Sequence, residues 1–358
     1  MIKSILTFLL ICFTSLNISE TKIETLKDLK PSPKKIPVIF DAHGVQRIDN
    51  YYWMRDDSRE NPEVISHLNS ENDYVENWFL SGEDERDSLF EEITDRIPKK
   101  EDSVPVRLKN YEYFRRYEPG NEYGIYIRRK DKNSQENIII DVNKLAKGKE
   151  FYQLANWSIS PDEKTMTYAE DESGRRQYTI KFKDLEKDTT SNYSLSNTSG
   201  DMAWSSDGKY LFYVLRNEET LLPFKLFRHE LGTSQDQDAL VYEEKDTTFY
   251  LSVGNTRSMD YIEVDISSTT SSEVRLIRSN DPTMSPEIFL TREKDHLYAV
   301  DHDPASSRFL IESNWKALNF RLLETPIDSF QDKTKWKELI PHRDCLLYTS
   351  DAADELCR

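Results

Sequence analysis

Residues 157–162 read Trp-Ser-Ile-Ser-Pro-Asp, and residues 204–208 read Trp-Ser-Ser-Asp-Gly. Each copy precedes a short apolar stretch, which ends at Tyr168 in the first copy and at Tyr213 in the second. Ser and Asp side chains bond to nearby backbone groups, so each motif predicts a tight turn before a strand. A strand–turn–strand unit that recurs about every 45 residues is typical of stacked sheets such as the blades of a β-propeller.

Two weaker units continue the series, with apolar strands that contain Val264 and Ile311. A hairpin is predicted around Tyr113, because residues 118–121 (Glu-Pro-Gly-Asn) favour a turn between two apolar runs. Counting these units, we predict an all-β fold: an incomplete β-propeller of about five blades over residues 98–344. The two repeated tryptophans are interpreted as side chains that pack between blades.

A helical segment is predicted before the propeller, within residues 20–97. Asn61, Pro62 and Glu63 favour a helix start, since Asn caps, Pro fits the first turn and Glu suits the positive end of the dipole. A second helix is predicted from Asp84 to Ile97. The apolar side chains on one face of each helix are Val64, Leu68, Val75 and Phe79, and then Leu89, Phe90, Ile93 and Ile97.

The N-terminus has the pattern of a secretory signal peptide. Lys3 precedes an apolar run from Ile5 to Phe13, and we assign residues 1–19 to this segment. The run is too short to span a bilayer, so we expect no stable membrane insertion. A periplasmic or secreted protein is therefore expected. The alternative is a cytoplasmic protein with a hydrophobic N-terminal extension.

The charge of the chain excludes some partners. It carries 65 acidic and 48 basic residues, for a formal net charge of −17. Non-specific nucleic-acid binding is disfavoured because phosphates would be repelled, whereas cationic substrates are compatible with this charge. The alternative is that the charge only keeps the protein soluble. The three cysteines, Cys12, Cys345 and Cys357, lie outside the repeats and define no disulfide framework or zinc site.

No catalytic motif is present in the sequence. The only glycines four apart, Gly120 and Gly124, flank Glu122 and cannot form a serine nucleophile elbow. The six histidines show no metal-ligand spacing. We therefore predict no catalytic, cofactor-binding or metal-ligating residue, and no cofactor. Two charge-dense segments, residues 170–176 and 243–246, could contact a substrate or another domain, but we interpret them as solvated turns.

A family resemblance rests on residues 47–57, which read Arg-Ile-Asp-Asn-Tyr-Tyr-Trp-Met-Arg-Asp-Asp. This segment resembles the N-terminal signature of oligopeptidase B, in the prolyl oligopeptidase family of serine peptidases. Further collinear matches lie at residues 96–98, 117–120, 175–178, 220–223, 242–246, 270–276, 294–296 and 336–341. The resemblance runs from Pro37 to Asp344.

The resemblance implies a two-domain enzyme. In this family a seven-bladed propeller restricts access to an α/β-hydrolase domain that carries a Ser-Asp-His triad, and the N-terminal helices pack on that domain. The oligopeptidase B branch cleaves short peptides after Arg or Lys. No position in this chain matches a catalytic residue. We therefore expect an inactive N-terminal portion, whose partners are short peptide substrates and the missing hydrolase domain. The alternative is a stand-alone propeller that binds protein partners.

The last residues, 345–358, depart abruptly from the family pattern. One reverse translation of this stretch resembles a transposon-end adapter used in sequencing libraries, so we interpret it as an artefactual tail. A genuine divergent tail is the alternative. An incomplete propeller would leave sheet edges and apolar blade faces exposed. We therefore expect the isolated chain to aggregate or unfold easily.

Overall fold

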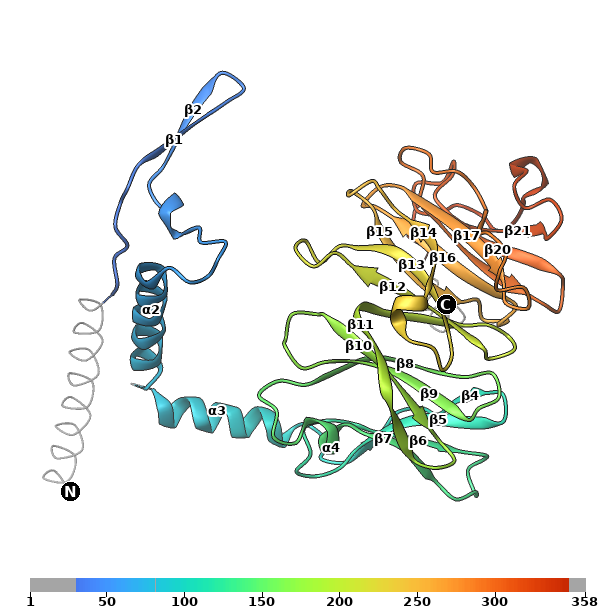
Figure 1. Ribbon diagram of the computed structural model, residues 1–358, viewed down its shortest axis with the longest axis horizontal. Coiled ribbons are helices and arrows are strands. Elements are labelled where there is room, and N and C mark those ends of the chain that lie inside the picture. Colours follow the sequence, from blue (N-terminus) through green and yellow to red (C-terminus); the bar gives the residue numbers. More distant parts are fainter. Residues whose placement is uncertain (1–29, 81, 348–358) are drawn as a thin grey trace, which may run out of the picture. The chain divides into compact units, whose positions relative to one another are not determined.

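The computed structural model describes residues 30–80 and 82–347 (Figure 1). The chain divides into two compact units, the first ending at Pro98 and the second beginning at Lys99. The predicted signal peptide lies outside the described residues, as does the greater part of the predicted artefactual tail.

The first unit contains a hairpin and two helices. The hairpin pairs β1 (Val38–Ala42) with β2 (Val45–Asp49), and a short 3-10 helix, η1 (Tyr52–Met54), follows. Both predicted helices are present as α2 (Pro62–Leu80) and α3 (Glu83–Asp95). Asn61 caps α2 as predicted, because its Oδ1 accepts the Glu63 N–H at 3.0 Å. None of the described helices is long and apolar enough to cross a membrane.

The second unit is a series of antiparallel sheets, which Figure 1 shows following one another from β4 to β21. Blade 1 comprises β3 (Glu101–Asp102), β4 (Val106–Leu108), β5 (Tyr111–Tyr117), β6 (Ile125–Arg129) and β7 (Asn137–Asp141), and a short helix, α4 (Val142–Ala146), follows it. Blades 2 and 3 share β11 (Thr189–Trp204); blade 2 adds β8 (Gln153–Ile159), β9 (Thr165–Asp171) and β10 (Tyr178–Asp184), and blade 3 adds β12 (Tyr210–Arg216), β13 (Pro223–Glu230) and β14 (Ala239–Glu243).

Blades 4 and 5 are separate four-stranded sheets. Blade 4 comprises β15 (Tyr250–Asn255), β16 (Tyr261–Ser267), β17 (Ser272–Arg278) and β18 (Glu287–Ile288). Blade 5 comprises β19 (Tyr298–Asp303), β20 (Arg308–Ser313), β21 (Arg321–Pro326) and β22 (Lys337–Ile340). Within the described part of the chain, no strand of blade 5 pairs with blade 1, so the sheets do not close a ring by strand exchange.

The long strand β11 passes from the outside of blade 2 to the inside of blade 3. Leu195 pairs with β10, Trp204 pairs with β12, and Thr198 pairs with both neighbours. Gly200 lies at this crossing with φ of +90°. This φ favours glycine, and a Cβ at this position would also lie close to the ring of Tyr178, at 3.2 Å.

The predicted blade turns are confirmed. Ser160 Oγ donates to Asp162 Oδ1 at 2.6 Å and accepts the Thr165 N–H at 2.9 Å. The second motif repeats this geometry, since Ser205 Oγ donates to Asp207 Oδ1 at 2.6 Å. The five positions aligned from the sequence all lie on the strand that is second across the sheet of its blade, β5, β9, β12, β16 or β20; they are Tyr113, Tyr168, Tyr213, Val264 and Ile311. The fold is therefore the predicted all-β propeller, with an N-terminal helical segment before it.

The core consists of apolar layers between successive blades. Both repeated tryptophans lie in these layers, as predicted: Trp204 between blades 2 and 3, and Trp157 against Tyr113 and Tyr126 of blade 1. Each layer joins two blades, so the blades stabilise one another as stacked repeats do.

The face of blade 1 that points away from blade 2 is not the bare apolar surface that we predicted. Phe114 and its neighbours are buried beneath two guanidinium groups, of Arg116 and Arg129, which lie 5.4 and 4.9 Å from the centre of the Phe114 ring. Arg116 pairs with Asp102 at 2.7 Å and with Glu136 at 2.8 Å. The expectation of an exposed apolar face is therefore wrong for this side of blade 1, because long charged side chains cover its centre.

Candidate functional surfaces

A buried histidine–aspartate pair lies in blade 3 and has the geometry of two members of a catalytic triad. His229 Nδ1 is 2.7 Å from Asp238 Oδ1, and Tyr213 donates to the other carboxylate oxygen at 2.9 Å. However, His229 Nε2 has no partner among the described residues, and the ring packs beside Phe182 and Tyr193. With no serine at Nε2 and no access to solvent, the pair is suited to structure rather than to nucleophilic catalysis.

Over residues 30–80 and 82–347, no group of three or more His, Cys, Asp or Glu side chains could hold a metal ion. The sequence named no catalytic, cofactor-binding or metal-ligating residue, and that expectation stays a prediction. The surfaces that can bind something must therefore be sought in charged networks, pockets and exposed apolar faces.

The first charge-dense segment is only partly a solvated turn. Glu170 and Asp171 are buried at the end of β9. Tyr152 donates its hydroxyl to Glu170 at 2.8 Å, and Asp171 accepts the Arg176 N–H at 2.7 Å. The interpretation of residues 170–176 as a solvated turn is therefore wrong for these two carboxylates. The charge pattern of residues 170–176 did not indicate this bond to Tyr152, which lies on the connection between α4 and β8.

The second charge-dense segment also contains a buried carboxylate, Glu244. It pairs with Arg292 at 2.6 Å, and Arg292 Nε lies 3.3 Å from a second buried carboxylate, Glu273. Burial alone would raise the pKa of Glu244, but hydrogen bonds from Arg292, the Asp246 N–H and the Tyr242 hydroxyl outweigh burial and lower it. The interpretation of residues 243–246 as a solvated turn is therefore wrong at Glu244, which joins the ends of blades 3 and 4.

Glu263 is a partly buried carboxylate on β16 whose surroundings disfavour its charge. Burial raises the pKa of Glu263 to about 8, and the nearby charges of Asp265 and Asp301 add to the effect. Burial also raises the pKa of Asp265, although a hydrogen bond from Ser267 opposes this shift. The inner part of blades 4 and 5 is thus an acidic region in which one carboxyl group retains its proton near neutral pH.

We expect Glu263→Gln to remove a pH dependence of stability. A carboxyl group with a raised pKa in the folded state stabilises the fold fully below its unfolded pKa of about 4.5, and this stabilisation is lost as the pH rises through about 8. At pH 9 the variant should therefore be more stable than the parent chain by ~1–3 kcal/mol. At pH 4 the two should differ little, and urea unfolding at both pH values measures the difference.

The exposed Glu219, at the turn after β12, provides the matched control for this experiment. Glu219→Gln should change stability by less than ~0.5 kcal/mol at either pH. A Glu263→Gln effect of the same size at both pH values would contradict the prediction.

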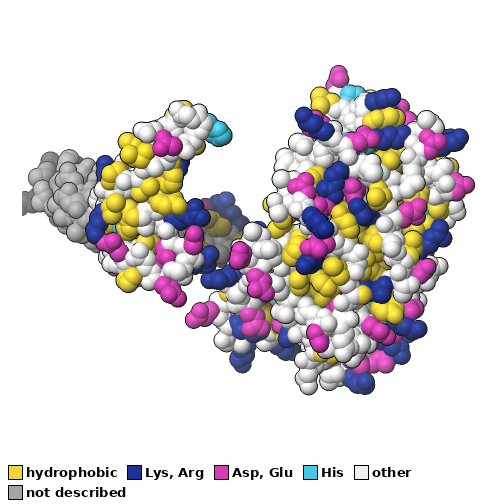
Figure 2. All heavy atoms as spheres, turned by 45° about the horizontal axis from the view of Figure 1, so that its top comes forward, with side chains coloured by type: hydrophobic (Ala, Val, Ile, Leu, Met, Phe, Trp, Pro, Cys, Tyr) yellow, Lys and Arg dark blue, Asp and Glu magenta, His cyan; other side chains and the backbone are white. Residues whose placement is uncertain are grey.

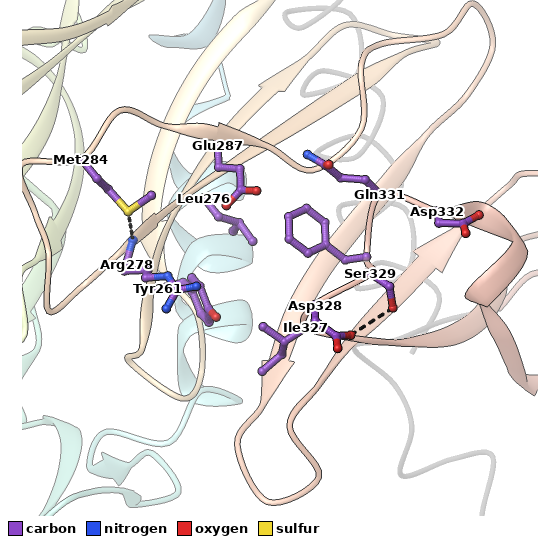
Figure 3. A pocket seen from close by; sticks show the side chains of 11 residues that line it. Tyr261, Leu276, Arg278, Met284, Glu287, Ile327, Asp328, Ser329, Gln331 and Asp332 are labelled. Carbon is purple, nitrogen blue, oxygen red and sulfur yellow. Dashed lines mark hydrogen bonds between the residues drawn. The ribbon is translucent and has the colours of Figure 1, made fainter.

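A pocket of about 460 Å³ lies between blades 4 and 5 (Figure 3). Its lining combines apolar with charged side chains: Tyr261, Leu276, Met284, Ile327 and Phe330, and then Arg278, Glu287, Asp328 and Asp332. Figure 3 shows Arg278 and Glu287 on the blade 4 side, opposite Asp328 and Gln331 from the β21–β22 loop. A smaller pocket of about 180 Å³ adjoins it through Tyr261 and Arg278.

Comparisons with known proteins agree with this architecture. The model of the N-terminal β-propeller domain of prolyl oligopeptidase matches residues 30–352. The chain belongs to the prolyl oligopeptidase family. It is 38% identical to dipeptidyl aminopeptidase BI of Pseudoxanthomonas mexicana over 87% of this chain and 45% of that protein. It is 32% identical to protease 2 of Moraxella lacunata, over 88% of this chain and 48% of that protein.

Solved structures of the family have the same fold. Oligopeptidase B from Leishmania major superposes with a TM-score of 0.80 at 29% identity, over 88% of this chain and 46% of that one. Oligopeptidase B from Trypanosoma brucei superposes with a TM-score of 0.78 at 25% identity, again over 88% and 46%. The chain thus spans about half the length of its family relatives, and it corresponds to their N-terminal propeller.

The N-terminal unit of this family member exposes an apolar surface. Only Val64 is buried among the large hydrophobic side chains of α2 and α3 in the described residues. The exposed apolar residues of these two helices include Ile65, Leu68, Val75, Phe79, Leu80, Leu89, Phe90 and Ile93. Figure 2 shows hydrophobic side chains gathered on the visible face of this unit. Many exposed apolar side chains on one unit indicate an interaction surface, and a hydrolase domain is the occupant that we predicted from the sequence.

We expect the double variant Phe79→Ser/Phe90→Ser to reduce self-association of the isolated chain. The two side chains are 54% and 66% exposed, so they contribute apolar area to any contact between copies. Removing both should weaken association at least ~10-fold. Sedimentation velocity over a range of concentrations measures this change. The control is Leu318→Ser on blade 5, where the side chain is 86% exposed but lies in the other unit. An equal effect of the control would contradict the role of the helices.

Proposed function

We propose that this chain is the propeller portion of a serine peptidase that hydrolyses short peptides, with catalysis carried out by a hydrolase domain. The observation that carries the proposal is the family match across all five blades, in a chain that covers 45–48% of its relatives. In such an enzyme a serine attacks the peptide carbonyl, a histidine accepts and returns the proton, and an acidic residue orients the histidine.

The role proposed for this chain is to control which substrates reach that site. Hydrogen bonds between inner strands of neighbouring blades support this role, because they hold the strands in a fixed arrangement. Asn156 Nδ2 donates to the Gly200 carbonyl at 3.1 Å, and the Asn255 amide bonds both backbone groups of Trp204, at 2.9 and 3.0 Å. In a complete propeller, blades held in this way would admit an extended peptide and exclude a folded protein.

For the parent enzyme we propose cleavage after Arg or Lys. The resemblance to oligopeptidase B supports this specificity, as does the 29% identity to a solved oligopeptidase B. A second candidate is a dipeptidyl aminopeptidase, because a relative with that name is 38% identical. The two activities differ in one requirement: a dipeptidyl aminopeptidase must recognise the free α-amino group two residues before the scissile bond.

One experiment distinguishes these activities in the parent enzyme, expressed from the gene with its downstream region. Two chromogenic dipeptides ending in Arg before the reporter are compared, one with a free and one with an acetylated amino terminus. Cleavage of both supports the oligopeptidase. Cleavage of the free form alone supports the dipeptidyl aminopeptidase, and cleavage of neither overturns the proposal.

The isolated chain is proposed to be inactive. It should release no chromophore from either dipeptide, and a serine-directed phosphonate should not label it. Turnover that the phosphonate abolishes would overturn this point. The alternative, a stand-alone propeller that binds partners, is tested by sequencing the gene beyond Asp344. A natural stop codon there would favour the module, whereas an in-frame Gly-x-Ser-x-Gly region would favour the peptidase.

We further propose that the parent enzyme is exported to the periplasm or secreted, on the basis of the Lys3 and apolar N-terminal pattern. Fractionation of cells that express the parent enzyme tests this. Recovery in the periplasm or medium, with the N-terminal residues removed, is expected. Recovery in the cytoplasm with an intact N-terminus would overturn the proposal.

A further inference from the structure

The two adjoining pockets form one groove at a single end of the blades. We call this the turn-end groove; it is lined by Ser206, Asp260, Tyr261, Leu276, Arg278, Ser279, Asn280, Met284, Glu287, His302 and residues 327–332. These residues come from the turns β11–β12, β15–β16, β17–β18 and β21–β22 and the adjoining strand ends. The groove therefore crosses three blades, and Tyr261 and Arg278 lie where its two parts meet.

The rim of the groove is predominantly acidic. Asp260 lies in the smaller part, and Glu287, Asp328 and Asp332 lie in the larger part. Arg278 is the basic residue between the two parts. A ligand that matches this arrangement carries a cationic group for the larger part and an anionic group for Arg278.

The floor of the larger part is apolar. Tyr261 is partly buried, and Leu276 and Phe330 are buried beneath the charged rim. Such a floor suits the aliphatic stem of a lysine or arginine side chain, whose charged head would reach the rim carboxylates. A small inorganic cation would leave this apolar surface uncovered.

Two buried polar atoms give a second and independent indication of a ligand. Ser279 and His302 both line the smaller pocket, and they are only 1% and 7% exposed. Neither Ser279 Oγ nor His302 Nε2 has a hydrogen-bond partner within the part of the chain that the structure describes. Buried polar groups are nearly always bonded, so unused hydrogen-bonding capacity beside a pocket is typical of a site that a polar ligand completes.

We propose that the turn-end groove binds the C-terminal end of a short peptide whose last residue is Lys or Arg. The α-carboxylate binds Arg278, and the basic side chain lies over Tyr261 and Leu276. Its charged head pairs with Glu287 and Asp328, and the peptide backbone bonds to groups of the smaller pocket. The groove's own charges define this ligand. Only its identification with a cleavage product rests on the proposed function.

The position of the groove keeps it accessible in a larger protein. Connections between blades, such as residues 244–249 and 289–297, lie at the opposite end of the strands from the turns that line the groove. The chain also enters blade 1 at that opposite end, before β3. A domain joined to the propeller through those ends would leave the turn-end groove open to solvent.

The test is equilibrium dialysis of the chain against labelled tripeptides at low ionic strength. The ligand is Ala-Ala-Arg with a free carboxylate, and the comparison peptides are its C-terminal amide and Ala-Ala-norleucine. We expect the free acid to bind at least ~5-fold more tightly than either comparison peptide, because each lacks one charged group. Spermidine is dialysed in parallel, as a cation without a carboxylate.

Variants locate the site on the groove. Glu287→Gln/Asp328→Asn should weaken Ala-Ala-Arg binding ~3- to 10-fold. Arg278→Gln should remove the preference for the free acid over the amide. Glu219→Gln, at the other end of blade 3, is the matched control and should leave binding unchanged. Circular dichroism should show the same fold for every variant.

The outcomes separate this inference from the proposed function. Absence of Ala-Ala-Arg binding at millimolar concentration, or binding that the groove variants leave unchanged, would overturn the inference. Tighter binding of spermidine than of the peptide would overturn the assignment of a peptide carboxylate to Arg278. Hydrolysis by the parent enzyme is measured separately with the chromogenic dipeptides, so either proposal can fail while the other holds.

Discussion

Replacement of Arg292 by Met is expected to lower the free energy of unfolding of the chain by ~3–5 kcal/mol. Arg292 pairs with Glu244 at 2.6 Å and with Glu273 at 3.3 Å, and both carboxylates are buried. Its guanidinium also lies 4.1 Å from the centre of the Phe249 ring. Met retains part of the volume of the Arg292 side chain but leaves the buried carboxylate of Glu244 without its cation. The loss measures the penalty of unpaired buried charge more than the value of the ion pair itself.

The stability lost in Arg292→Met should depend on pH. Despite burial, hydrogen bonds, that from Arg292 first among them, lower the pKa of Glu244 in the folded state. The stability that Glu244 contributes is therefore present above its unfolded pKa and is lost as the pH falls through its folded pKa. Without Arg292 this acid-dependent part of the stability should shrink. The difference between the parent chain and the variant should therefore be larger at pH 7 than at pH 4 in urea unfolding.

Arg257→Met is the matched control, because Arg257 is exposed on the turn between β15 and β16. Its cost should be below ~0.5 kcal/mol. If Arg292→Met costs no more than this control, the Glu244–Arg292–Glu273 network does not stabilise the junction of blades 3 and 4.

The sequence predicted the features of the propeller that are local. The Ser–Asp turn is made by residues within five positions of each other, so the motif at residues 157–162 predicted it directly. The helices were predicted for the same reason, since Asn61 caps a helix through a residue two positions away. Blade number and helix positions follow from such short-range signals.

Features that depend on distant partners were not predicted. Glu244 and Arg292 are 48 positions apart, so the charge pattern around Glu244 indicated a solvated turn instead of a buried pair. The continuous strand β11 was also missed, because nothing local distinguishes it from two strands with a turn between them. The turn-end groove is assembled from turns of three blades. Its charged residues are unremarkable in the sequence and form a surface only after the blades stack.

The last prediction concerns the two tryptophans that mark the repeat. Trp204→Ala is expected to lower the free energy of unfolding by ~3–5 kcal/mol, and Trp157→Ala by only ~1–2 kcal/mol. Trp204 is fully buried, at 0% exposure, whereas Trp157 is partly exposed beside the edge of blade 1. The backbone bonds between Trp204 and Asn255 do not involve the indole and should survive the substitution. The loss therefore reports packing between blades 2 and 3.

A third variant separates packing from hydrogen bonding at this position. Trp204 Nε1 has no partner among the described residues, so Trp204→Phe removes volume but breaks no hydrogen bond and should cost less than Trp204→Ala. Urea unfolding of all three variants gives the comparison. Equal costs for Trp157→Ala and Trp204→Ala would mean that the copies are equivalent in energy as well as in sequence. A larger cost at Trp204 would instead show that burial sets the energy, because Trp204 is enclosed between blades 2 and 3 whereas Trp157 is partly exposed.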